Sequence, residues 1–188
     1  MKSRIEEVAP VSEELWNEIL LHAKIVDIEK GQKLVTCKST LRRGYFIVSG
    51  SFESSIITTD GSSKTIWFYF DELFPVIVCM DSYFMGIPTM YQVTALEQSK
   101  VIVFEKEMID AWVLKYPSFN EYYRSDLAKD FMIASEIRNH LVSRSSLDFL
   151  KYIHANYPIL LSRTPSKNVA HFMGITPEWY SKLKRRIS

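Results

Sequence analysis

The last 25 residues of the chain combine two helix-start signals with basic residues at a spacing that suits contact with nucleic acid. Thr164-Pro165 and Thr176-Pro177 each place a capping hydroxyl before a proline, which favours the first position of a helix. Gly174 falls between the two helices, where a tight turn needs a residue that tolerates a positive φ. The spacing therefore predicts a helix-turn-helix, a motif that leaves one face of its second helix free.

The free face of the second helix carries groups that can read and hold a DNA duplex. Glu178 can accept a hydrogen bond from a cytosine amino group, and Lys182 can reach guanine acceptors or a phosphate. An alternative is that the hairpin packs internally with its charges in solvent, or binds a protein partner. We expect double-stranded DNA as the partner, contacted by Ser166, Lys167, Thr176, Pro177, Glu178, Ser181, Lys182, Lys184, Arg185 and Arg186.

The net charge of +1 conceals an uneven distribution of charge along the chain. Residues 143–188 contain eight basic and two acidic residues, so this segment carries +6. The remaining residues include 15 basic and 20 acidic side chains, so they carry −5. An acidic body with a basic C-terminal end favours a nucleic-acid partner for that end.

The segment before these helices has the pattern of an antiparallel β-barrel or roll. Short runs rich in Val, Ile, Thr, Phe and Tyr alternate with glycine turn signals, and they follow a helix over 12–22 that Ser12 can cap. Asp60-Gly61 predicts a type I′ hairpin turn, because both residues tolerate a positive φ. We expect strands at 25–28, 33–37, 45–49, 52–58, 64–70, 92–96 and 100–104.

A long helix follows, from residue 119 to about 141, after a short helix over 107–116. Its apolar residues recur every three or four positions and form one stripe, which either packs on the chain's own domain or pairs with a second copy. We expect a homodimer seam there, formed by Tyr123, Leu127, Phe131, Ala134, Ile137 and Leu141. A further helix is expected over 147–157. The predicted organisation is α+β: an antiparallel β-roll in residues 1–118, a dimerisation helix in 119–142 and a helix-turn-helix domain in 143–188.

This order of elements resembles the cyclic-AMP receptor protein / fumarate-nitrate regulator (Crp/Fnr) family over nearly the whole chain. The sequence YFIVSG at 45–50 looks like the strand-and-glycine signature of that family, and GITPE at 174–178 looks like the start of its recognition helix. The resemblance implies a jelly-roll-like, cyclic-nucleotide-binding-type sensor domain and a homodimeric transcription regulator. It implies a two-fold DNA site with half-sites about 34 Å apart, and it raises RNA polymerase as a further partner.

Individual residues of the recognition helix also match the family. Glu178 matches a glutamate that commonly reads a base there, and Lys182 matches a basic residue that often joins it. Pro177 stands where some members have arginine, so we expect a different preferred DNA sequence. The sequence ends at Ser188, just beyond the second helix, so we expect a short form without a C-terminal wing.

The ligand-binding signature of the family is missing. Members that bind cyclic nucleotides hold the phosphate with a Gly-Glu helix and an Arg-Ser or Arg-Thr pair, and a buried phosphate needs such a guanidinium. Here Thr89 and Met90 occupy the place of that pair, and Lys100 is the only basic residue between 74 and 101. We therefore expect no cyclic AMP and no resident cofactor. The apolar and aromatic residues of this region either fill the core or form a pocket for an apolar or aromatic effector. The candidate pocket residues are Trp67, Phe70, Phe74, Tyr83, Phe84, Met85, Thr89, Met90 and Tyr91.

Other function classes have no support in the sequence. No phosphate-binding loop, nucleophile elbow or zinc-protease motif occurs, so we expect no enzymatic activity. Cys37 and Cys79 lack metal-ligand spacing, are too few for an iron–sulfur cluster, and are expected to be reduced core thiols. No apolar run approaches the roughly 20 residues of a membrane helix, and the N-terminus lacks a secretory apolar stretch. We expect a cytoplasmic protein without a metal site.

Overall fold

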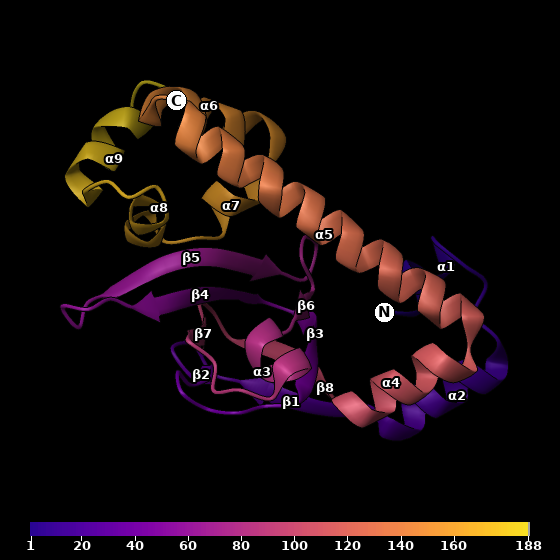
Figure 1. Ribbon diagram of the computed structural model, residues 1–188. Coiled ribbons are helices and arrows are strands. Elements are labelled where there is room, and N and C mark those ends of the chain that lie inside the picture. Colours follow the sequence, from indigo (N-terminus) through magenta and orange to yellow (C-terminus); the bar gives the residue numbers. More distant parts are fainter. Residues whose placement is uncertain (188) are drawn as a thin grey trace.

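The computed structural model describes residues 1–187 and consists of a β-roll and a helical C-terminal domain, joined by one long helix (Figure 1). The roll contains two antiparallel four-stranded sheets, with strand orders β1-β8-β3-β6 and β2-β7-β4-β5. Its strands are β1 (Lys24–Ile28), β2 (Lys33–Val35), β3 (Arg43–Ser49), β4 (Ser51–Ile57), β5 (Ser63–Phe70), β6 (Val76–Ile77), β7 (Tyr91–Ala95) and β8 (Ser99–Glu105). The α+β prediction of a roll, a long helix and a helical C-terminal domain is confirmed.

Alternation of side chains along the strands gives each sheet an inner and an outer face. In β3, Tyr45 and Ile47 point into the roll, whereas Phe46 lies on the opposite face. The interior of the roll is filled by Ile28, Val35, Tyr45, Ile47, Phe52, Ile77, Cys79, Val93, Ala95 and Val101. The outer face of each sheet is therefore available for packing against helices.

The helices cover both outer faces of the roll. Trp112 and Phe119 belong to a buried cluster with Phe104, on the outer face of the sheet that contains β8. The helices are α1 (Lys2–Glu6), α2 (Glu13–His22), α3 (Met80–Met85), α4 (Lys106–Lys115), α5 (Pro117–Ser143), α6 (Ser146–Asn156), α7 (Pro158–Ser162), α8 (Ser166–Phe172) and α9 (Pro177–Lys184). Ser12 caps α2 as predicted, by accepting a hydrogen bond from the Leu15 N–H. The long helix α5 begins two residues earlier than expected, because Pro117 fits its first turn.

The β4–β5 hairpin forms, but the predicted type I′ turn is wrong. The Gly61 N–H donates to the Thr58 carbonyl at 2.9 Å, and the Thr58 N–H donates to the Ser62 carbonyl at 2.8 Å. Gly61 has a φ of +82°, while Asp60 is not among the residues with a positive φ in the described chain. The loop therefore has three residues rather than two: a type I turn followed by a left-handed glycine.

Gly50 joins β3 to β4 in a conformation that suits only glycine. Its φ is +112°, and a Cβ atom placed there would lie 2.1 Å from Ser99 Oγ and 2.8 Å from Ser99 Cα. The Gly50 N–H donates to Asp71 Oδ2 at 3.1 Å. The glycine of the YFIVSG segment thus lets β4 leave β3 while the backbone passes close to Ser99.

The two cysteines are free thiols in different environments. Cys79 is 8% exposed in the roll core, and burial raises the pKa of its thiol to about 11. Cys37 is only partly buried, so its expected core position is wrong: it lies in the turn after β2, because that strand ends at Val35. Within residues 1–187, no helix is long and apolar enough to cross a membrane.

Candidate nucleic-acid interface

The helix-turn-helix consists of α8, a turn at Gly174, and α9. Gly174 has a φ of +67°, and its N–H donates to the His171 carbonyl at 3.1 Å. The Ile175 N–H donates a hydrogen bond to the Ala170 carbonyl at 3.0 Å, which closes the turn in the manner of a Schellman cap. Ala170 is 0% exposed, and its small side chain fits within this tightly packed motif.

The two threonines behave differently at the helix starts. Thr176 Oγ1 accepts a hydrogen bond from the Trp179 N–H at 3.2 Å, so it caps α9 as predicted. The expected cap by Thr164 is wrong, because Pro165 occupies the N-cap position of α8. Thr164 lies one residue too early, and its buried Oγ1 has no hydrogen-bond partner among residues 1–187.

The outer face of α9 is open to solvent, while its inner face packs on the domain. Tyr180 and Leu183 are each 1% exposed and join the core that contains α6 and α8. The Ser181 hydroxyl donates to the Pro177 carbonyl at 2.9 Å, so it is already bonded to its own helix. Of the ten residues expected to contact DNA, Pro177 is partly buried. The other nine are exposed: Ser166, Lys167, Thr176, Glu178, Ser181, Lys182, Lys184, Arg185 and Arg186.

Removing the cap of α9 tests whether this helix is positioned as described. Thr176→Ala is expected to lower the free energy of unfolding by about 1 kcal/mol, because the Trp179 N–H loses its acceptor. Urea denaturation measures this change. Ser181→Ala serves as the control and is expected to change stability by less than about 0.5 kcal/mol. Equal effects from both substitutions would contradict a specific capping role.

The helix-turn-helix rests on the outer face of the sheet that contains β5, and α8 lies directly over this strand (Figure 1). Phe68 and Phe70 of β5 share one buried core with Phe149 and Val169 of the helical domain. Phe172 packs edge-on against Phe68, with ring centroids 5.4 Å apart. The C-terminal domain is thus docked on the roll through α8, and α9 keeps its outer face exposed.

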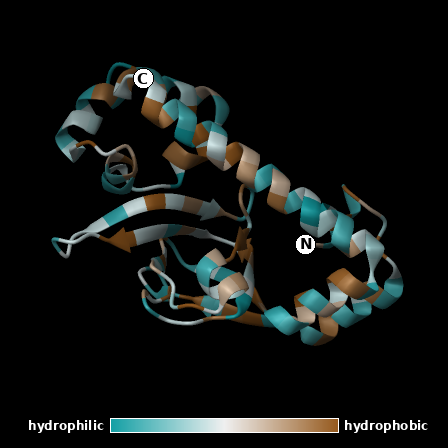
Figure 2. Cartoon of the chain, viewed as in Figure 1, coloured by the Kyte–Doolittle hydropathy of each residue, from teal (hydrophilic) through white to brown (hydrophobic). Residues whose placement is uncertain are grey.

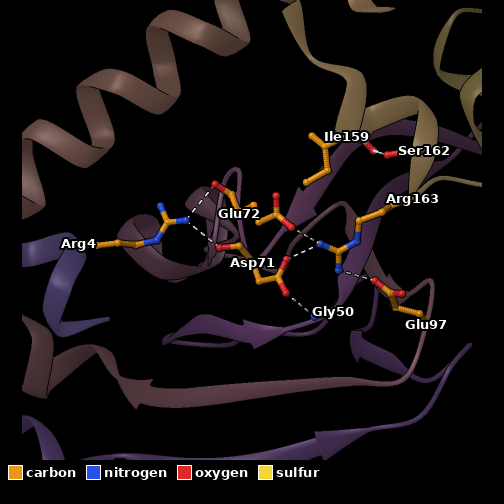
Figure 3. Close-up of polar contacts among 8 residues, drawn as sticks. All are labelled: Arg4, Gly50, Asp71, Glu72, Glu97, Ile159, Ser162 and Arg163. Atoms are coloured by element: carbon orange, nitrogen blue, oxygen red, sulfur yellow. Dashed lines mark hydrogen bonds and ion pairs between the residues drawn. The ribbon is translucent and has the colours of Figure 1, made fainter.

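A polar cluster centred on Asp71 and Arg163 secures this docking (Figure 3). Arg163 Nη1 lies 2.5 Å from Asp71 Oδ1, and Arg163 Nη2 lies 2.7 Å from Glu97 Oε1. From the other side, Arg4 Nη2 donates to the backbone carbonyls of Asp71 and Glu72 at 2.8 and 2.9 Å. By its position in the sequence, Arg163 belongs to the basic C-terminal segment. The structure pairs it with the acidic roll instead.

The nine residues of the candidate effector pocket do not come together in one cavity. Phe70 is buried under the helical domain, Tyr91 packs against the roll core, and Met85 is 71% exposed. Trp67 and Phe74 instead line a crevice of about 240 Å³ beneath α5, and Tyr83 and Phe84 line a smaller cavity of about 70 Å³ next to it. Thr89 is buried, and Met90 and Phe84 are more than half exposed.

Hydrophilic and hydrophobic residues alternate along α5 (Figure 2), and the predicted dimer seam divides between several environments. Ile137 is 1% exposed in the chain's own core, and Leu141 packs against that core. Tyr123 lines the smaller cavity, Ala134 lines the crevice beneath α5, and Leu127 lines both. Phe131 also borders the crevice and is 72% exposed. Its exposed neighbour Met132 and the distant Val142 were not part of the predicted stripe.

The chain is similar in fold to solved structures of known proteins. No protein-family model matches the chain, and no curated protein sequence matches it. Among solved structures, FixK2 from Bradyrhizobium japonicum has a TM-score of 0.71 at 13% identity, covering 88% of this chain and 84% of that one. The regulator CLP of Xanthomonas campestris, described as responsive to c-di-GMP, has a TM-score of 0.71 at 11% identity, covering 94% of this chain and 91% of that one. The catabolite activator protein of Thermus thermophilus has a TM-score of 0.55 at 15% identity, covering 94% of this chain and 84% of that one.

These neighbours are transcription regulators of the Crp/Fnr type, and they align with both the roll and the helical domain. The expected resemblance is therefore confirmed at the level of structure. The chain has the fold of the Crp/Fnr regulators, with a cyclic-nucleotide-binding-type β-roll, a long connecting helix and a C-terminal helix-turn-helix.

Proposed function

We propose that the protein is a DNA-binding transcription regulator that acts as a homodimer and uses α9 as its recognition helix. The observation that carries the proposal is the outer face of α9, which is exposed and carries Lys182, with the exposed Arg185 and Arg186 directly after the helix. A helix of this kind enters the major groove with its N-terminal residues toward the bases. Glu178 lies in the first turn of α9, where it can meet a base edge.

The distribution of charge supports the same orientation on DNA. Arg163 pairs with Asp71 and Glu97 of the roll, and the C-terminal segment still holds seven other basic residues. The acidic part of the chain, with its net charge of −5, repels the phosphate backbone. Productive contact is therefore expected from the helix-turn-helix end.

The exposed apolar residues of α5 support a dimer through this helix. Phe131, Met132 and Val142 are each at least 70% exposed, although they lie on a helix of 27 residues in the middle of the chain. Exposed apolar patches of this kind mark interaction sites. Pairing of α5 with a second copy would cover them and would bring two α9 helices to half-sites about 34 Å apart.

Cyclic AMP is not the expected effector, and Asp81 provides the physical reason. Its carboxylate accepts hydrogen bonds from the Ser82 N–H at 2.8 Å and the Met90 N–H at 3.0 Å. The Ser82 N–H at the start of α3 and the Met90 N–H beside Thr89 are thus already hydrogen-bonded to the Asp81 carboxylate. A phosphate placed there would meet a negative charge and no guanidinium.

Titration with labelled duplex DNA at several salt concentrations tests the DNA-binding proposal. The triple substitution Lys182→Ala, Arg185→Ala and Arg186→Ala is expected to weaken binding at least about tenfold. It should also reduce the salt slope by about one for every phosphate that no longer has a basic partner. Fluorescence anisotropy measures both quantities. The control triple variant is Lys24→Ala, Lys30→Ala and Lys33→Ala, which removes three exposed lysines from the roll and is expected to bind like the wild type.

Two outcomes would contradict the proposal. Failure to bind any duplex at low salt would favour the alternative, in which the C-terminal helices bind a protein. Equal weakening by the two triple variants would show that net charge, rather than α9, sets the affinity. The oligomeric state is tested separately by sedimentation of the wild type and Met132→Glu, which is expected to shift the protein toward monomer.

A further inference from the structure

The crevice beneath α5 is a semi-enclosed site between the long helix and the roll. It has a volume of about 240 Å³, and its floor includes Val76 and Val78 at the outer face of the roll. It shares Asp126, Leu127 and these two valines with the smaller cavity of about 70 Å³. The crevice is smaller than the roughly 300–1,000 Å³ of a drug-sized pocket. The space therefore suits a small ligand.

Aromatic rings form one side of this crevice. Trp67, Tyr69 and Phe74 all line it, and the Trp67 and Phe74 rings meet edge-on with centroids 5.0 Å apart. Aromatic faces attract a cation through the ring quadrupole, and they also pack against an apolar ligand body. The walls thus suit either an apolar group or a positively charged one.

Two carboxylates of α5 favour a positively charged ligand over a purely apolar one. Asp126 and Asp130 lie one helical turn apart, both line the crevice, and within residues 1–187 neither forms an ion pair or a side-chain hydrogen bond. Burial, followed by repulsion from Asp126, raises the pKa of Asp130 to about 7. Partial burial of these carboxylates is costly, because the water that their charged forms lose outweighs the attraction of Arg4 and Lys129.

A third polar group on the same side of α5 also lacks a partner. Tyr122, one turn before Asp126, is 6% exposed and lines the smaller cavity, and its hydroxyl has no hydrogen-bond partner in the described part of the chain. The cations that lower the pKa of the two carboxylates are Arg4 of α1 and Lys129 of α5, and within residues 1–187 neither forms an ion pair with them. Arg4 is held by the backbone carbonyls of residues 71 and 72. The crevice therefore presents two carboxylates with which no cation of residues 1–187 forms an ion pair.

We propose that the crevice binds a small organic cation, an ammonium group carried on an aromatic or apolar body. The ammonium would pair with Asp126 and Asp130, and the body would pack on Trp67, Tyr69 and Phe74. An organic anion would meet uncompensated carboxylates, and a neutral ligand would leave them unpaired. Because α5 connects the roll to the helix-turn-helix, a ligand held there contacts both the sensor domain and the helix that leads to α6.

Calorimetric titration with 2-phenylethylamine tests the proposal on the full chain without DNA, so its outcome is independent of DNA binding. The wild type is expected to bind the amine at least tenfold more tightly than the neutral 2-phenylethanol or the anion phenylacetate. Asp126→Asn and Asp130→Asn are each expected to weaken amine binding at least tenfold. The control Glu121→Gln removes an exposed carboxylate of α5 that lies outside the crevice, and it should leave binding unchanged.

A second variant separates the site from general electrostatic attraction. Ala134→Phe keeps both carboxylates but fills part of the crevice, so it is expected to abolish amine binding while thermal unfolding confirms that the domain remains folded. No heat of binding with the wild type would overturn the proposal. Binding that survives Asp126→Asn, Asp130→Asn or Ala134→Phe would do so as well, and so would equal affinity for the amine and the alcohol.

Discussion

Gly50→Ala is expected to lower the free energy of unfolding by at least about 3 kcal/mol, from a strained backbone and a steric clash together. The φ of +112° at this position is one that alanine rarely adopts. The added methyl group would also lie 2.8 Å from Ser99 Cα, a backbone atom that cannot move without displacing β8. The loss should appear in urea denaturation followed by circular dichroism.

Gly61→Ala is the matched control for this substitution. Gly61 also has a left-handed φ, +82°, but apart from its two chain neighbours no described residue has an atom within 4 Å of the position of an added Cβ. This variant carries only the backbone penalty, so its expected cost is about 1 kcal/mol. The difference between the two variants isolates the close approach of Gly50 to Ser99. If both cost the same, the contact with Ser99 contributes nothing to the requirement for glycine.

Arg163→Ala is expected to destabilise the protein by about 2–3 kcal/mol, because it leaves Asp71 and Glu97 without their cation. The Arg163 side chain is 25% exposed and that of Asp71 is 23% exposed, so water replaces the pairing only in part. We expect the largest local effect where the helical domain meets the roll. Hydrogen exchange should increase in β5 and α8 more than in the roll interior around β3.

Two further variants test whether the loss of stability in Arg163→Ala comes from the pairing of Arg163 with the two carboxylates. Arg163→Lys keeps the charge but cannot hold both carboxylates with one planar fork, so it should lie between the wild type and Arg163→Ala. Arg124→Ala removes an exposed arginine from α5 and is expected to change stability by less than about 0.5 kcal/mol. Uniform faster exchange over the whole chain after Arg163→Ala would argue against a specific docking role.

The roll and the helix-turn-helix could be predicted because their signals are local. Alternation in residues 45–49 places Tyr45 and Ile47 on one face, and the Thr176-Pro177 pair sets the start of α9 within a single turn. The shortest elements could not be predicted, because they are too short to show a repeating pattern of apolar residues: β6 has two residues, and α1 has five. The turn at Asp60 was misassigned because loop length, and not only residue type, decides which residue takes a positive φ.

The sites that depend on distant contacts could not be predicted. Arg163 and Asp71 are 92 positions apart, and nothing in either local sequence indicates the other. The nine candidate pocket residues lie on different elements and faces of the roll, and within residues 1–187 Trp67 and Phe74 are the only two of them that line the α5 crevice. Asp126 and Asp130 lie outside the predicted apolar stripe, and the helical pattern alone does not indicate that the roll lies beneath them.

The different environments of the two cysteines make the chain suitable for attachment of one dye without mutation. Cys79 is buried and its thiol has a pKa of about 11, so almost none of it exists as the reactive thiolate at neutral pH. Cys37 is partly exposed in the turn after β2, on the roll. A maleimide fluorophore should therefore modify Cys37 alone, which places a single reporter on the β-roll of an otherwise unaltered protein.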